Sequence, residues 1–210
     1  MKQYPSIHHL DSSLLGRSAV AFNKIDGSNL RFEWSKKRSW NKFGSRTQMI
    51  SESHGQFGPA VKMFMNKYAY QLEKIFKDDK DLRNIQEFVV YCEYAGDKSC
   101  FGQHVEGDIM DLVLFDVSLY KKGFMGPKDF VRKFGELGIP EIIYDGLLTE
   151  EFVRSVKHSE TLKEGAVVKG MENGRVWMTK LKTLKWLESL RLKEGDKAIE
   201  EEFHGSIANK

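Results

Sequence analysis

The sequence predicts an α+β fold with mostly antiparallel sheets. Short segments rich in β-branched and aromatic residues recur along the chain, and segments with helical periodicity lie between them. The pair Asn173-Gly174 separates two of the short segments, and this dipeptide is a strong signal for a β-hairpin. The predicted strands are residues 18–23, 30–34, 87–95, 111–119, 141–144, 165–170 and 175–181.

Helical periodicity appears in four segments. Residues 59–76 place apolar side chains at helical spacing and predict an amphipathic helix. Residues 128–136 and 150–158 also predict helices. After residue 183 the pattern predicts one charged helix, near residues 184–192, and then a polar tail.

The composition is that of a globular protein with an apolar core. Hydrophobic residues make up 40% of the 210 residues and charged residues 30%. The formal net charge of +3 is too small to indicate nucleic-acid binding by itself. Basic residues cluster at 36–38 and 180–193, and a solvated basic face explains such clusters equally well.

Cysteine usage and hydropathy indicate the compartment. Cys92 and Cys100 do not form a Cys-x-x-Cys pair, which argues against both a disulfide framework and a zinc site. The N-terminus lacks the apolar segment of a signal peptide, and no apolar run is long enough for a membrane span. We therefore expect a reducing, cytoplasmic location without membrane association.

The run Lys24-Ile25-Asp26-Gly27 lies between the first two predicted strands. Asp26-Gly27 is a turn signal, so we expect Lys24 at or beside a tight turn between antiparallel strands. Gly27 allows the backbone to bend and brings amides close to a ligand.

A lysine that attacks a nucleotide needs particular surroundings. Its ordinary pKa is near 10.4, so nearby cations or burial must favour the free amine. The phosphates need counter-charge, generally a divalent metal with Lys or Arg. The nucleoside needs an aromatic or aliphatic platform and an acceptor for the ribose hydroxyls.

Three residues in the first part of the chain suit the nucleotide's needs. Arg46 can bind a phosphate bidentately, with Lys36 and Lys42 as alternatives. Glu93, near the end of an apolar strand, is a candidate acceptor. Phe115 is a candidate base platform, although a strand aromatic can also be an ordinary core residue.

Four charged residues in the last strands complete the set. Glu164 and Lys169 lie at opposite ends of one predicted strand, where Lys169 could also be an ordinary surface lysine. Lys180 and Lys182 alternate on the last strand, so both side chains face the same side. Two lysines on one side are costly unless an anion lies between them.

These residues resemble the ordered motifs of the covalent nucleotidyltransferases, the polynucleotide ligases and RNA capping enzymes. The resemblance implies a ligase adenylation-domain fold, with antiparallel sheets flanked by helices around a nucleotide cleft. The matching motifs are Lys24-Ile25-Asp26-Gly27, Tyr91-Cys92-Glu93-Tyr94-Ala95-Gly96, Leu114-Phe115-Asp116-Val117, Glu164-Gly165-Ala166-Val167-Val168-Lys169 and Trp177-Met178-Thr179-Lys180-Leu181-Lys182.

The run Gly27-Ser28-Asn29 resembles the corresponding run of the ATP-dependent RNA ligases of the type 2 branch. DNA ligases and capping enzymes more often carry Arg at the position of Asn29. The resemblance implies that Lys24 takes AMP, that Glu93 binds the ribose and that Phe115 stacks on adenine. It also implies that Glu164 supports a metal, Mg²⁺ or Mn²⁺, and that Lys180 and Lys182 hold the α-phosphate. The full nucleotide-binding set is Asn23, Lys24, Ile25, Asn29, Arg46, Glu93, Phe115, Lys169, Lys180 and Lys182.

Two features depart from that family pattern. Asn23 stands where type 2 RNA ligases commonly carry Glu. The chain ends at Lys210, too soon after Lys182 for an OB-fold or a helical second domain. We therefore expect an adenylyltransferase domain over residues 1–182 and a helix with a tail over 183–210. We expect self-adenylylation, with strand joining that is weak, substrate-limited or dependent on a partner.

The activity implied by the resemblance is ATP-dependent RNA ligation in RNA repair. The partners would be RNA or RNA/DNA strand ends, whether at a nick, a single-strand break or a tRNA-like loop. A DNA ligase core, a GTP-dependent capping enzyme and a non-catalytic nucleic-acid-binding module remain the alternatives.

Overall fold

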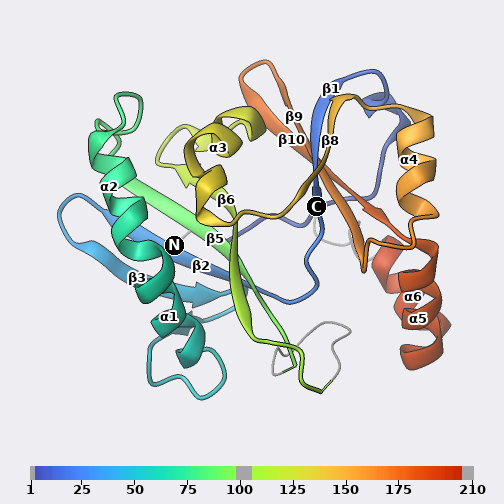
Figure 1. Ribbon diagram of the computed structural model, residues 1–210, viewed down its shortest axis with the longest axis horizontal. Helices are drawn as coiled ribbons and strands as arrows, with labels where there is room; N and C mark the ends of the chain where they lie inside the picture. The colour runs from blue at the N-terminus through green and yellow to red at the C-terminus, as the bar shows by residue number, and fades with distance from the viewer. Residues whose placement is uncertain (1–2, 98–105, 205–210) are drawn as a thin grey trace. The chain divides into compact units, whose positions relative to one another are not determined.

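The computed structural model describes residues 3–97 and 106–204, and its contacts divide the chain into two compact units. The six-stranded unit comprises Met1–Tyr4 and Asp26–Ile139, and the four-stranded unit comprises Pro5–Ile25 and Pro140–Lys210. Each unit has its own antiparallel sheet with helices beside it (Figure 1). The predicted α+β class is confirmed.

The sheet of the six-stranded unit has the order β4-β3-β2-β5-β6-β7. Its strands pair with antiparallel neighbours throughout. The strands β5 and β6 have the predicted bounds, whereas β3, β4 and β7 were not predicted. The strands are β2 (Ser28–Ser35), β3 (Ser39–Ser45), β4 (Met49–Ile50), β5 (Glu87–Ala95), β6 (Asp111–Leu119) and β7 (Gly123–Phe124).

Aromatic stacking joins the helices of this unit to its sheet. Phe64 stacks on Phe32 and Phe76 stacks on Phe88, each pair with ring centroids 3.8 Å apart. Figure 1 shows α1 and α2 along one face of the sheet. The predicted helix 59–76 is thus confirmed, but a π-helical turn interrupts it. The helical segments are α1 (Gly58–Phe64), the π-helical turn (Met65–Ala69), α2 (Tyr70–Asp78), α3 (Pro127–Phe134) and a 3₁₀ turn (Gly135–Leu137).

The sheet of the four-stranded unit has the order β10-β9-β1-β8. Asn173 and Gly174 both have positive φ, 49° and 73°, which fits the predicted hairpin turn between β9 and β10. The strand bounds are β1 (Ser18–Asn23), β8 (Ile142–Leu147), β9 (Gly165–Glu172) and β10 (Arg175–Lys182).

Helix α4 (Glu150–Lys157) supplies the core on one face of this sheet. The hydroxyl of Thr149 caps it by accepting the Phe152 N–H at 3.1 Å. Its apolar side chains and those of β1, β9 and β10 form one buried cluster, which includes Ala21, Val153 and Val168. The opposite face of β9 and β10 therefore remains for the charged side chains.

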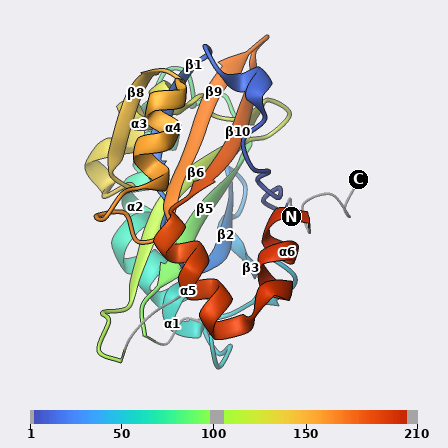
Figure 2. The same ribbon diagram turned by 90° about the vertical axis from the view of Figure 1, so that its right-hand side faces the viewer.

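The C-terminal segment differs from the prediction. Helix α5 (Leu184–Glu194) is capped by Thr183 and ends at Gly195, whose φ is 84°. A second helix, α6 (Asp196–His204), follows where a polar tail was expected (Figure 2). The many acidic residues of α6 hid its helical pattern, although Ile199 and Phe203 lie four residues apart.

The segment around Lys24 also differs from the prediction. Strand β1 pairs with β8 and β9, whereas β2 pairs with β3 and β5, so the two strands belong to different sheets. The expected hairpin is therefore wrong. Asp26-Gly27 lies in the connection between β1 and β2, but a local turn signal does not determine which strands pair.

Candidate active site

Lys24 lies directly after β1 and is held against the start of β9. Its backbone N–H donates to the carbonyl oxygen of Gly165 over 2.9 Å. Its side-chain Nζ donates to Glu164 Oε2 over 2.8 Å. The nucleophile candidate and the metal candidate predicted from sequence are thus in direct contact.

Glu164 contacts a second lysine as well. Its other oxygen, Oε1, accepts a hydrogen bond from Lys182 Nζ. The side chains of Glu164 and Lys182 are each only 4% exposed, while that of Lys24 is 22% exposed. One buried carboxylate therefore compensates two ammonium groups, and the more accessible of these is Lys24.

The backbone at Gly165 explains how Glu164 reaches Lys182. Gly165 pairs with Lys182 across β9 and β10 and has a φ of 147°. A Cβ at this position would lie 1.9 Å from the carbonyl oxygen of Leu181. Only glycine permits this approach of the two strands.

Lys180 lies beside an anion that was not predicted. Glu202 of α6 places Oε1 2.7 Å from Lys180 Nζ and 3.6 Å from Lys182 Nζ. The two lysines face the same side of β10, as predicted, and the carboxylate that lies near both comes from the C-terminal helix.

His9 contacts Glu202 from the N-terminal segment. This segment runs beside β10, where the Lys180 N–H donates to the His8 carbonyl oxygen over 2.9 Å. His9 Nε2 lies 3.2 Å from Glu202 Oε1 and 3.1 Å from the Glu202 carbonyl oxygen. Its ring stacks on Phe203 with centroids 4.3 Å apart. Neither His9 nor Glu202 belongs to a predicted motif, and their sequence separation hides their contact.

Charge and burial shift two pKa values in this cluster. Burial alone would raise the pKa of Glu202, but the hydrogen bond with His9 and the charges of Lys182 and Lys180 lower it to about 2. Burial lowers the pKa of Lys182, although Glu164 opposes that effect. The Trp186 ring also lies against Lys182, with Nζ 3.4 Å from its centroid.

Asn23, Ile25 and Lys169 belong to the same unit. The Asn23 N–H donates to the Glu141 carbonyl oxygen over 2.8 Å, and Ile25 is the last residue of this N-terminal portion. Lys169 lies along β9 with Nζ 5.4 Å from the centroid of the Phe22 ring. It is 4% exposed, so it is not an ordinary surface lysine.

The other predicted nucleotide-binding residues belong to the six-stranded unit. Asn29 on β2 lies directly opposite Glu93 on β5. Arg46 is exposed in the turn after β3, and its carbonyl oxygen accepts from Arg31 Nη1 over 3.2 Å. Lys42, an alternative to Arg46, is engaged with Glu33 at 2.7 Å.

Phe115 lies at an irregularity of β6. Tyr91 pairs with Asp116 and Cys92 pairs with Leu114, so the register of β6 against β5 shifts by one residue at Phe115. Such a bulge re-aims a side chain and is frequent beside functional sites. Phe115 is partly exposed and contacts the Tyr4 ring edge-to-face at 5.0 Å, so it is not simply a core residue.

A buried hydrogen bond supports this strand. Asp116 is 1% exposed and accepts from the Tyr4 hydroxyl over 2.8 Å and from the Val117 N–H over 2.9 Å. Burial and the Asp116 charge raise the pKa of Tyr4 well above its ordinary value, so Tyr4 stays a donor. Sequence reasoning missed Tyr4, which lies far from the motifs along the chain.

The RNA ligase family model matches residues 17–187 of the chain. This chain belongs to the RNA ligase family. The matched segment contains every predicted motif and ends before α6. No curated protein sequence matches significantly.

Solved structures of Naegleria gruberi RNA ligase resemble this RNA ligase family member in fold. An aspartate-to-alanine variant without ligand has a TM-score of 0.67 at 15% identity, covering 92% of this chain and 58% of that one. The complex with pyrophosphate has a TM-score of 0.65 at 17% identity, covering 92% and 59%. A lysine-to-alanine variant with ATP and manganese has a TM-score of 0.64 at 17% identity, covering 90% and 58%. The chain therefore spans less than two thirds of these ligase chains.

The metal candidate of this family member is a single carboxylate. Among the described residues, no three His, Cys, Asp or Glu side chains gather in a way that could hold a metal ion. Mg²⁺ usually binds through one or two carboxylates and substrate phosphates, whereas both oxygens of Glu164 contact lysines here. Within residues 3–97 and 106–204, no helix is long and apolar enough to cross a membrane.

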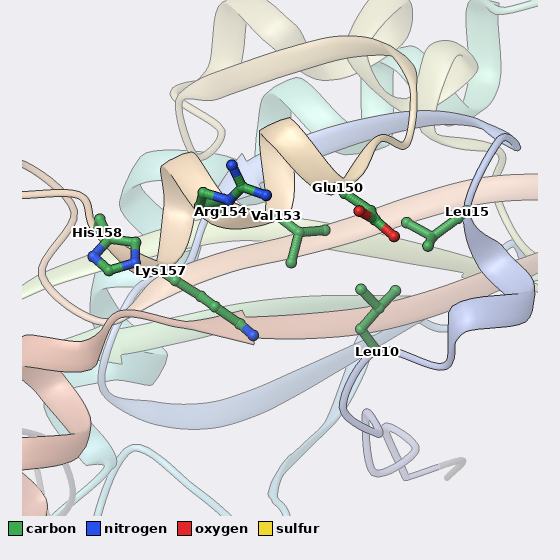
Figure 3. Close-up of a pocket in the computed structure, with 7 residues that line it drawn as sticks. All are labelled: Leu10, Leu15, Glu150, Val153, Arg154, Lys157 and His158. Carbon is green, nitrogen blue, oxygen red and sulfur yellow. The ribbon is translucent and has the colours of Figure 1, made fainter.

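A pocket of about 380 Å³ lies beside α4 and contains none of the predicted site residues. Figure 3 shows Val153 and Lys157 of α4 opposite Leu10 and Leu15 of the N-terminal segment. Its lining residues are Leu10, Leu15, Glu150, Val153, Arg154, Lys157 and His158.

Proposed function

We propose that this chain is the catalytic part of an ATP-dependent RNA ligase. Lys24 would attack the α-phosphate of ATP and become lysyl-AMP. The AMP would then pass to an RNA 5′-phosphate, and a 3′-hydroxyl would displace it and seal the strand. The observation that carries this proposal is the contact of Lys24 with Glu164, beside Lys182.

The first step requires Lys24 to lose a proton. The neighbouring Lys182 ammonium favours the free amine, and Lys24 is 22% exposed, so its proton can leave to solvent. The new bond joins Nζ to the α-phosphorus, and the bond to the bridging oxygen of the β-phosphate breaks, releasing pyrophosphate. Glu164 holds the amine in place before the attack, which restricts its orientation.

Lys180 and Lys182 would hold the α-phosphate. Both project to one side of β10, and Lys182 shares Glu164 with the nucleophile. Their ammonium groups would stabilise the charge that builds up on the phosphate oxygens during transfer. A divalent cation, Mg²⁺ or Mn²⁺, held by Glu164 and phosphate oxygens, would offset the remaining phosphate charge.

The remaining roles rest on the motif resemblance. Glu93 would bind the ribose and Phe115 would stack on adenine. Arg46 and Asn29 would contact the nucleotide and help sealing. The register shift of β6 against β5 at Phe115 supports its role, because such irregularities re-aim side chains. Asn23, Ile25 and Lys169 complete the proposed nucleotide-binding set.

Named complexes of the similar ligase support the choice of nucleotide. Naegleria gruberi RNA ligase variants were solved with ATP and manganese and with AMP and manganese. By analogy, ATP and a divalent metal are the cofactors proposed here.

The proposed partners are RNA or RNA/DNA strand ends and a protein that assists strand joining. The adenylyltransferase domain would comprise residues 1–182, with residues 183–210 as an appendage. The proposed compartment is the reducing cytoplasm, where a buried free thiol such as Cys92 stays reduced. Cys100 lies outside the described residues.

A substrate panel tests the proposed function. The protein is incubated with ATP or GTP, Mg²⁺, and 5′-phosphorylated RNA or DNA, either nicked or single-stranded. We expect sealed RNA with ATP. Preferential sealing of DNA would instead support a DNA ligase core, transfer from GTP alone a capping enzyme, and RNA binding without transfer a non-catalytic module.

A further inference from the structure

The carboxylate of Glu202 lies where an anion is expected between two lysines. Its Oε1 is 2.7 Å from Lys180 Nζ and 3.6 Å from Lys182 Nζ. The side chain is only 17% exposed, and its pKa is lowered to about 2, so it carries a full negative charge at neutral pH. The ammonium groups of Lys180 and Lys182 are thus already compensated by a segment of the chain itself.

We propose that α6 is an internal plug, in which Glu202 occupies the place of the nucleotide's α-phosphate. This inference rests on the proposed function, because it assumes that Lys180 and Lys182 bind that phosphate. A carboxylate oxygen and a phosphate oxygen both require the same ammonium donors, and the two anions would repel each other. ATP must therefore displace Glu202 before Lys24 can react.

The contacts of α6 suit a segment that docks and releases. At the end of the helix, Phe203 stacks on His9, and Glu202 contacts the two lysines. Earlier in the helix, Asp196, Lys197 and Glu201 are highly exposed. Ala198 and Ile199 are only half-buried, and a surface helix with few fully buried side chains opens at lower cost than the core of the fold.

Docking of α6 should weaken nucleotide binding, because only the open state would bind the nucleotide. A ligand that binds only the open state has an apparent affinity reduced by the open fraction. Any change that loosens α6 should therefore tighten binding, including a change that leaves all charges in place.

Binding of AMP tests the plug, because AMP carries the α-phosphate but cannot transfer itself to Lys24. We expect Glu202→Gln in the full chain to lower the dissociation constant of AMP about tenfold. Removing a negative charge could raise anion affinity without any plug, so a second variant is needed. Phe203→Ala loosens α6 from His9 and keeps Glu202, and it should also tighten AMP binding by a few-fold.

The matched control is Glu200→Gln, which removes the same charge from an exposed position of the same helix. Its AMP dissociation constant should stay near that of the unmodified chain. Unchanged or weaker AMP binding in either Glu202→Gln or Phe203→Ala would overturn the plug.

Hydrogen exchange provides a second readout that does not depend on catalysis. Saturating AMP should accelerate exchange of the backbone amides of residues 197–203 in the unmodified protein, because α6 is released. Unchanged or slower exchange there would contradict the proposal. Failure of the proposed function would appear separately, as absence of lysyl-AMP with ATP while these effects of AMP persist.

Discussion

Glu164 uses its two carboxylate oxygens on two different lysines, and one of these bonds runs to Lys24 Nζ over 2.8 Å. The other partner, Lys182, is almost fully buried. Glu164 therefore acts as the shared counter-ion of the proposed nucleophile and of a proposed phosphate ligand. Its loss should affect both stability and nucleotide transfer.

Glu164→Gln should lower the free energy of unfolding by about 3 kcal/mol, because it leaves Lys24 and Lys182 close together without their shared counter-ion. Urea denaturation measures the change. The matched control is Glu160→Gln, whose side chain is 86% exposed and which should stay within about 0.5 kcal/mol of the unmodified protein. Equal stability of the two variants would contradict the assignment of Glu164 as a buried counter-ion.

Tyr4→Phe should destabilise the protein by about 1–3 kcal/mol. The substitution removes the hydroxyl donor of the buried Asp116 carboxylate and leaves the ring contacts in place. Thermal or urea unfolding measures the loss, and the exposed Tyr120→Phe serves as the control. If Tyr4→Phe were as stable as Tyr120→Phe, the hydrogen bond to Asp116 would make no net contribution to the free energy of unfolding.

Gly27→Ala should also destabilise, by about 1–3 kcal/mol, because the added Cβ would lie 2.5 Å from the Tyr94 carbonyl oxygen. The clash is with backbone, which cannot move aside as a side chain can. At Gly135 a Cβ meets nothing within 4 Å, so Gly135→Ala is the control and should be neutral or slightly stabilising. Similar midpoints of urea unfolding for both variants would refute the close approach at Gly27.

The stability that Glu202 contributes should depend on pH. Its pKa is lowered from 4.5 to about 2, with His9, Lys180 and Lys182 facing it. A lowered pKa in the folded state adds stability above pH 4.5, and this contribution disappears as the pH falls toward 2. The stability difference between the unmodified protein and Glu202→Gln should therefore be constant above about pH 5 and shrink below pH 4. A difference that grows on acidification would be inconsistent with a charged Glu202.

Much of the fold follows from local patterns. The strands β1, β5 and β6 have the predicted bounds because β-branched and aromatic residues concentrate there between clear turn signals. Strand β3 was missed because Ser39–Ser45 follows a basic cluster and its register against β2 shifts between Glu33 and Trp34. That irregularity breaks the simple alternation on which strand prediction depends.

The sequence identified Lys24, Glu164 and Lys182, which the structure places in contact. The alternation of Lys180 and Lys182 also indicated that an anion would be needed between them. The sequence alone could not identify Glu202 as that anion, because the contact depends on how α5 and α6 turn back after β10. A polar helix far along the chain carries no local sign of its partner.

The most direct test of the central claim is mass analysis of the protein after incubation with ATP and Mg²⁺. Peptide mapping should find AMP attached to Lys24 through a phosphoramidate, which acid removes. Lys24→Ala should take up no AMP, while Lys163→Ala, an exposed lysine next to Glu164, should react normally. Absence of AMP from the unmodified protein, or AMP uptake that survives Lys24→Ala, would contradict the proposed mechanism.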